Sequence, residues 1–105
     1  MGSEKYKLRY LPLFEHDLLE SVKYITNVLY NPEAALDLVE EVEVSIKKRL
    51  FNPTSFEPYP SVKKRELPYY PIYVKNYIVF YVVLGDVMEV RRFIYKKRNI
   101  ENILS

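Results

Sequence analysis

The chain opens on a stretch in which charged and apolar residues alternate. Between Lys5 and Leu11 the basic residues occupy every second position, and tyrosine and leucine lie between them. A period of two predicts a strand with one buried face. Pro12 marks the end of this strand, because proline cannot donate to a ladder.

The period then becomes that of a helix. Apolar residues recur every three or four positions from His16 to Tyr30, and a second such stripe runs from Ala35 to Leu50. Between the stripes, Asn31 supplies an N-cap oxygen and Pro32 suits the first helical position. Two helices joined by almost no linker predict an antiparallel hairpin. The second helix is acidic early and basic late, as its dipole favours, so we assign its charges no function.

The remainder of the chain predicts a sheet. A proline-rich loop, Asn52 to Ser61, precedes segments rich in tyrosine, valine, isoleucine and phenylalanine. The predicted strands are Lys63 to Leu67, Ile72 to Lys75, Tyr77 to Leu84 and Val87 to Tyr95. Gly85 and Asp86 form a tight hairpin turn, and a short helix from Asn99 to Leu104 closes the chain.

The predicted fold class is therefore α+β: an N-terminal strand, an antiparallel two-helix hairpin, a twisted antiparallel meander and a short C-terminal helix. We expect one domain over residues 4–105. Helices packed on one face of the sheet would leave the other face for a partner.

The amino-acid composition excludes several kinds of functional site. The 105 residues are 49% apolar, which suffices for one core, and they include no cysteine and a single histidine. Disulfides and thiol nucleophiles are thus excluded, and we expect no metal site. Glycine occurs only at positions 2 and 85, so no glycine-rich phosphate loop exists and no cofactor is expected. Without an apolar run of membrane-spanning length, we expect a cytoplasmic protein with no membrane partner.

Charge is distributed unevenly. The net charge is only +2, but residues 12–60 sum to −5 and residues 61–105 to +5. Half of the sixteen cations lie in three short segments, which are Lys63, Lys64 and Arg65, then Arg91 and Arg92, then Lys96, Lys97 and Arg98. Such cations with nearby tyrosines could bind nucleic acid, or could serve a metal-free nuclease that stabilises phosphate charge. The alternative is a solvated surface with half-buried tyrosines.

Arg91 and Arg92 are adjacent on a predicted strand. Since neighbouring strand residues point to opposite faces, the two arginines are expected to lie on different faces. Arg91 would share its face with Glu89, Phe93 and Tyr95, the more polar set, so we expect Arg91 on the exposed functional face. Arg92 is then expected to be a sheet-edge or ion-paired residue.

Four segments together resemble the RelE/ParE superfamily of toxins from type II toxin–antitoxin systems. They are Asn31 to Ala35, Lys64 to Leu67, Asn76 to Val83, and Val90 to Tyr95 with its basic continuation. The resemblance covers nearly the whole chain. It implies a small α+β toxin that inhibits growth, acts in plasmid stabilization and is neutralised by a cognate antitoxin wrapping its sheet and helices.

The resemblance leaves the target open. RelE-like members cleave mRNA in the ribosome with cations and a late tyrosine or histidine, whereas ParE-like members inhibit DNA gyrase without nuclease chemistry. The arginine that RelE-like members carry on one strand is replaced here by Ile78, and their late tyrosine falls near Ile103. We therefore favour gyrase inhibition. The alternatives are a metal-independent, ribosome-dependent mRNA endonuclease and an antitoxin-binding module without toxicity.

The resemblance also suggests site residues. If the protein is a nuclease, the catalytic candidates are Arg91, Tyr95, Lys97 and Arg98. The candidates for binding the target or RNA are Lys63, Lys64, Arg65, Arg92 and Lys96. The sequence leaves the oligomeric state open.

Overall fold

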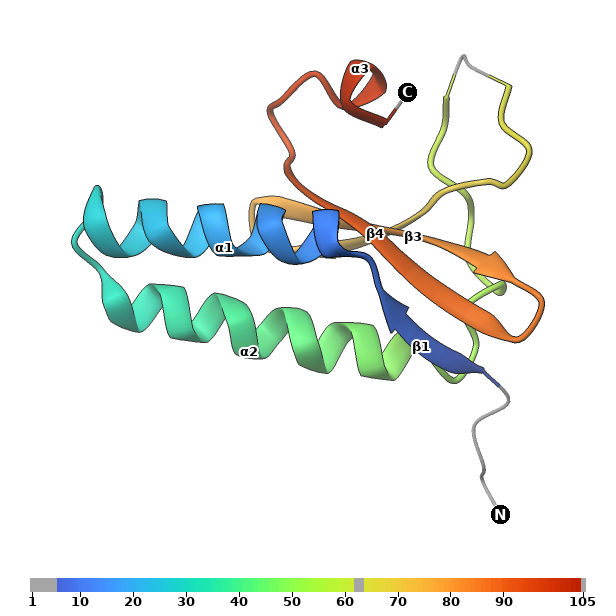
Figure 1. Cartoon of the computed structure of the whole chain (residues 1–105), viewed down its shortest axis with the longest axis horizontal. Helices are drawn as coiled ribbons and strands as arrows, with labels where there is room; N and C mark the ends of the chain where they lie inside the picture. The colour runs from blue at the N-terminus through green and yellow to red at the C-terminus, as the bar shows by residue number, and fades with distance from the viewer. Residues whose placement is uncertain (1–5, 62–63, 105) are drawn as a thin grey trace.

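A computed structural model describes residues 6–61 and 64–104 of the chain (Figure 1). Its elements are, in order, β1 (Lys7–Tyr10), α1 (Pro12–Asn27), α2 (Pro32–Arg49), β2 (Tyr70–Val74), β3 (Tyr77–Leu84), β4 (Val87–Tyr95) and α3 (Ile100–Leu104). The predicted α+β class is confirmed, as are the helical hairpin, the meander and the short last helix. None of the helices in these ranges combines the length and apolar character that crossing a membrane requires.

The four strands form one sheet in the order β1-β4-β3-β2. β2, β3 and β4 are antiparallel neighbours, while β1 pairs in parallel with β4. A parallel pair needs a long crossover, and the α1–α2 hairpin supplies part of it. The β3–β4 turn has Gly85 at φ 60°, a positive angle that glycine adopts without steric cost.

The helix boundaries confirm one prediction and correct another. Asn31 caps α2 as expected, because its side-chain oxygen accepts a hydrogen bond from the Ala34 amide at 3.1 Å. However, α1 begins at Pro12 and not at His16. The proline that ends the strand also occupies the first turn of the helix, where its missing N–H is not needed.

The main core lies between the helical hairpin and one face of the sheet. Its most deeply buried side chains come from α2, β3 and β4, and include Leu38, Val42, Ile46, Val79, Tyr81, Met88 and Val90. The opposite face is not left free as expected. A second cluster there, Ile78, Phe80 and Ile94, is covered by Ile100 and Leu104 of α3 with Tyr59 and Tyr69 packed against it.

The predicted strand from Lys63 to Leu67 is wrong over the described residues 64–67, and Lys63 lies outside them. The side chain of Arg65 contacts Ser61 and Glu101 of α3. Pro68 follows, and it cannot donate a ladder hydrogen bond. The segment therefore runs toward α3, and pairing with β3 begins only at Tyr70.

A buried tyrosine fastens the end of α2 to the sheet. The Tyr81 hydroxyl donates to the Pro53 carbonyl oxygen at 2.7 Å and accepts from Arg49 Nη1 at 2.9 Å. Arg49 also donates to the Pro71 carbonyl oxygen at 3.1 Å and lies over the Phe56 ring. Burial raises the pKa of the Tyr81 hydroxyl despite the nearby guanidinium. Arg49 thus serves packing as well as the helix dipole.

Replacing Tyr81 by phenylalanine should lower the free energy of unfolding by about 1–2 kcal/mol, because the Pro53 carbonyl would lose its donor in a buried site. Urea unfolding followed by circular dichroism measures this change. Tyr73→Phe is the control, since Tyr73 is 62% exposed and should change stability by less than about 0.5 kcal/mol. Equal stability of the two variants would contradict the role assigned to the hydroxyl.

Candidate functional site

A β-bulge places both arginines of β4 on the same face of the sheet. Phe80 of β3 is opposite Arg92 and Tyr81 is opposite Val90, so Arg91 is an extra residue without a partner. Val90 and Phe93, three positions apart, both join the helix-side core. The prediction that adjacent residues must face opposite ways is therefore wrong here. Arg91 and Arg92 line one common depression together with Tyr69, Ile103 and Leu104.

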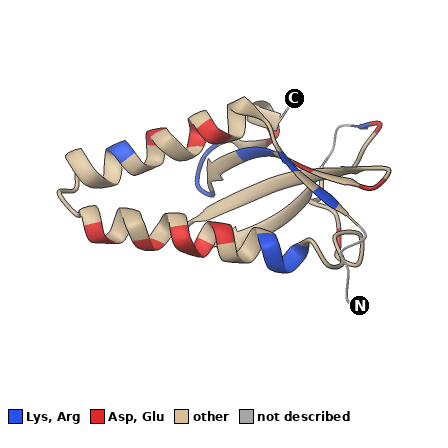
Figure 2. Ribbon diagram, turned by 60° about the horizontal axis from the view of Figure 1, so that its bottom comes forward, with Lys and Arg blue, Asp and Glu red and all other residues tan. Residues whose placement is uncertain are grey.

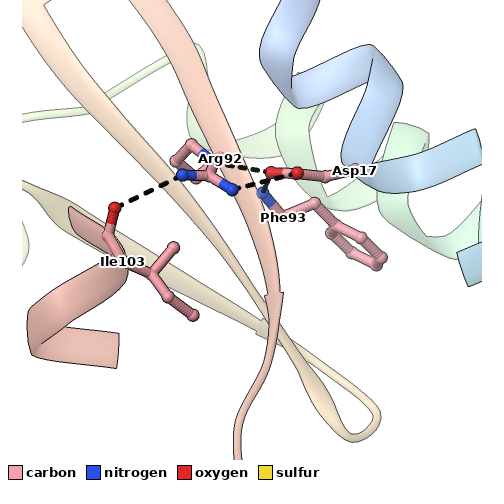
Figure 3. Close-up of polar contacts among 4 residues, drawn as sticks. All are labelled: Asp17, Arg92, Phe93 and Ile103. Carbon is pink, nitrogen blue, oxygen red and sulfur yellow. Dashed lines mark hydrogen bonds and ion pairs between the residues drawn. The ribbon is translucent and has the colours of Figure 1, made fainter. Parts of the chain in front are cut away.

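Arg92 connects α1, β4 and α3 (Figure 3). Its Nε and Nη2 donate to the two carboxylate oxygens of Asp17 at 2.7 and 3.1 Å, and Nη1 donates to the Ile103 carbonyl oxygen at 3.3 Å. Asp17 also accepts the Phe93 amide at 3.0 Å. Since β1 pairs with β4 only as far as Val90, this carboxylate covers an edge amide that no strand reaches. The expectation that Arg92 is a sheet-edge or ion-paired residue is confirmed, because Arg92 is ion-paired with Asp17.

Arg91 belongs to a second ion cluster. Its Nε donates to Glu89 Oε1 at 2.8 Å, and Arg9 of β1 donates to Glu89 Oε2 at 2.9 Å. Burial alone would raise the pKa of Glu89, but hydrogen bonds from Arg91 and Arg9 outweigh it and lower that pKa. Burial also opposes charge on Arg91, yet its bonds to Glu89 and Tyr69 raise its pKa. The Arg91 side chain is 29% exposed and that of Arg92 21%, so Arg91 is only slightly more accessible.

A groove of about 470 Å³ lies beside Arg91. We call it the arginine groove, and its lining includes Lys64, Arg65, Leu67, Tyr69, Arg91 and Leu104. The guanidinium carbons of Arg65 and Arg91 lie 5.2 and 5.9 Å from the centre of the Tyr69 ring. The structure thus brings together three of the predicted site residues, Lys64, Arg65 and Arg91.

The remaining candidates lie elsewhere. Tyr95 ends β4 with its ring edge-on to that of Tyr77, 5.5 Å away, and Tyr77 stacks on Phe93 of the helix-side core. Lys96, Lys97 and Arg98, which we call the basic exit, form the exposed turn that follows. Neither Tyr95 nor the basic exit lines the arginine groove. Lys63 falls outside the described residues.

Sequence reasoning missed three residues of these clusters, which are Arg9, Asp17 and Tyr69. Glu89, two positions before Arg91, was expected on the same face as Arg91, but its ion pair with Arg91 was not foreseen. Arg9 and Asp17 could not be found in this way, because their contacts with β4 span about 75–80 residues of sequence.

Figure 2 shows that acidic residues follow the helices, while basic residues gather at the end of α2 and along the β4 region.

A helical hairpin over one face of a four-stranded sheet agrees with the small α+β toxin that the RelE/ParE resemblance implies. Over residues 8–100 the sequence matches the family model described as "ParE toxin of type II toxin-antitoxin system, parDE". The chain belongs to the ParE toxin family. It is therefore a type II toxin, and the ParE-like prediction is favoured over the RelE-like one.

A solved structure agrees with this fold. It is titled "Chromosomal ParDE TA system from P. aeruginosa", and it matches with a TM-score of 0.72 and 18% sequence identity. The match covers 89% of this chain and 98% of the other. A search of curated protein sequences finds no match.

Proposed function

We propose that this toxin arrests bacterial growth in the cytoplasm by inhibiting DNA gyrase, without cutting nucleic acid. The observation that carries this proposal is the separation of Tyr95 from Arg65 and Arg91. A nuclease needs a proton-transfer group and phosphate-stabilising cations around one phosphate. Here Tyr95 packs against Tyr77 on the helix side, whereas both arginines line a groove on the opposite face.

The pairing of the two groove arginines with carboxylates supports the same conclusion. Arg91 is held by Glu89, and Arg65 lies 3.7 Å from Glu101. Ile78, where RelE-like members carry an arginine, is buried beneath α3. A transition state with extra negative charge would meet neighbouring carboxylates in this groove, which opposes catalysis.

The basic exit is the surface that we propose contacts the target. Lys96, Lys97 and Arg98 are all exposed, and within the described ranges no ion pair involves them. Their charges are thus available to steer and orient an acidic partner. By contrast, Arg92 is committed to Asp17, so we assign it a structural task and not a target contact.

Gyrase supercoiling assays with purified toxin test this proposal. Replacing Lys97 and Arg98 together by alanine should raise the toxin concentration needed for half-inhibition about tenfold or more, because two contacting charges are lost. The matched control replaces Lys47 and Lys48 of α2, which removes the same charge from another exposed surface and should leave inhibition unchanged.

Three other outcomes would contradict the proposal or part of it. Growth arrest with cut transcripts on ribosomes, and no effect on supercoiling, would overturn the proposal in favour of mRNA cleavage. Normal growth after induction of the chain alone would indicate an antitoxin-binding module without toxicity. Equal loss of inhibition in both double variants would contradict the assignment of the basic exit.

We also propose that a cognate antitoxin neutralises the protein, as the ParDE title of the similar structure suggests. An amphipathic segment with acidic residues would suit the basic surfaces described above. Co-expression with the product of a neighbouring small open reading frame should then restore growth. Failure of every adjacent frame to do so would contradict a locally encoded antitoxin.

A further inference from the structure

The end of the helical hairpin carries exposed apolar side chains. Val28, Leu29 and Tyr30 lie in the connection between α1 and α2, and Tyr24 lies one helical turn before Val28. We call these four residues the hairpin tip, and each of them is more than half exposed. Figure 1 shows the hairpin projecting beyond the strands, with this connection at its outer end. None of the four belongs to either core cluster of the described residues.

Tyr30 adopts a backbone conformation that residues with a Cβ normally avoid. Its φ is 53°, in the left-handed region where the Cβ crowds the backbone. The turn is closed by the Asn31 amide, which donates to the Ile25 carbonyl oxygen at 3.0 Å. Glycine would adopt the same turn without steric cost.

The ring of Tyr30 does not offset this strain within the monomer. It is 84% exposed, the highest value among the large apolar residues that the structure describes. The folded monomer therefore gains little burial from this side chain. Backbone strain that no internal contact offsets is typical of functional positions. We infer that the ring makes its contact with a second molecule.

The charge of the tip favours a second copy of this chain. Charged residues make up 29% of the sequence, yet residues 24–32 contain none. Depletion of charge and enrichment in tyrosine are typical of the centres of protein interfaces. A two-fold dimer places each surface against itself, so a charged surface would meet charge of its own sign. The uncharged tip avoids this repulsion, whereas the acidic helix surfaces and the basic exit do not (Figure 2).

The exposed area of the tip suits a weak dimer. At their observed exposures, two tyrosines, a valine and a leucine present about 500 Å² on each copy. Two such surfaces bury about 1,000 Å² in total, which is near the lower limit for a specific interface. The expected dissociation constant is therefore on the order of 10–100 µM.

We propose that two copies of the chain associate through their hairpin tips about a two-fold axis. Tyr30 of each copy packs against Val28 and Leu29 of the other. The interface excludes the basic exit and the arginine groove, so both stay accessible in the dimer. This association is independent of gyrase being the target.

Sedimentation equilibrium of the purified full chain, from about 5 to about 500 µM, tests the proposal. The weight-average mass should rise from 12.6 kDa toward twice that value as the concentration increases. Tyr30→Gly should keep the fold, because glycine adopts a positive φ freely, and should weaken association about tenfold or more. A purely structural role for Tyr30 would leave the association unchanged in this variant.

Leu29→Glu is a second variant, in which two carboxylates would face each other across the axis and association should be lost. Its matched control is Val44→Glu, since Val44 of α2 is equally exposed and the charge change is the same. That control should associate like the parent.

Three results would overturn the proposal. They are a monomer at every concentration, association that survives both tip variants, and equal loss of association in Val44→Glu. Binding of the monomer to phosphatidylcholine vesicles through Tyr30, without self-association, would also overturn it in favour of a lipid surface. Because the assay contains no gyrase, failure here and failure of the proposed target are separate results.

Discussion

Replacing Asp17 by alanine should lower the free energy of unfolding by about 3 kcal/mol. This carboxylate is largely buried and makes both bonds to Arg92 as well as the bond from the Phe93 amide. Its loss leaves a guanidinium and an edge amide without their acceptor. Removing one partner of a largely buried ion pair costs more than the pair itself contributes, since the remaining charge is stranded.

Chemical unfolding at neutral pH measures the Asp17 effect. Asp17→Asn should cost less than Asp17→Ala, because its amide oxygen can still accept from Phe93 while the charge is lost. Asp37→Ala, an exposed aspartate of α2, is the matched control and should stay within about 0.5 kcal/mol of the parent. A loss below about 1 kcal/mol for Asp17→Ala would show that the contact with Arg92 is not a structural clamp.

The helices and the β3–β4 hairpin could be predicted from sequence because their signals are local. The Asn31 cap, the apolar stripe of α2 and the Gly85 turn depend on residues a few positions apart. The start of α1 was missed because Pro12 suits two roles. A proline ends a ladder and also opens a helix, so its presence alone did not indicate which boundary it marked.

The positions of the arginines could not be predicted by alternation alone. Alternation holds only in an unbroken ladder, and the bulge at Arg91 interrupts it. One indication was nevertheless present in the predicted elements. Tyr77 to Leu84 contains eight residues and Val87 to Tyr95 contains nine, with a two-residue turn between them. Full pairing of unequal strands requires one unpaired residue, although the sequence does not say where.

The candidate site was only partly predictable for a related reason. Lys64, Arg65 and Arg91 were identified from their charge and do lie together, but the carboxylates that pair with the arginines were not recognised as part of the site. A cluster of cations in a sequence does not show which carboxylates will pair with them in the fold. Pairing in three dimensions decides the role of each arginine. An arginine held by a carboxylate stabilises the fold, whereas an unpaired, exposed arginine can attract an acidic partner.

Glu89 gives the second large effect, and this effect depends on pH. Glu89→Gln should lower the free energy of unfolding at pH 7 by about 2 kcal/mol, less than for Asp17 because Arg9 is half exposed and can regain water. The folded-state pKa of Glu89 is lowered from 4.5, so the folded state favours the charged form. Its contribution is therefore fully present above pH 4.5 and is lost as pH falls through the lower folded-state pKa.

The difference in stability between the parent protein and Glu89→Gln should accordingly be constant near neutrality and shrink in acid. Urea unfolding between pH 7 and pH 3 measures it at each pH. Glu43→Gln is the matched control, since Glu43 forms an exposed pair with Lys47 and should change stability by less than about 0.5 kcal/mol at any pH. A gap between the parent and Glu89→Gln that widens in acid would contradict the lowered pKa. The bulge brings Arg91 and Arg92 to one face of the sheet. The carboxylates of Glu89 and Asp17 pair with these two arginines and so stabilise both cations on that face.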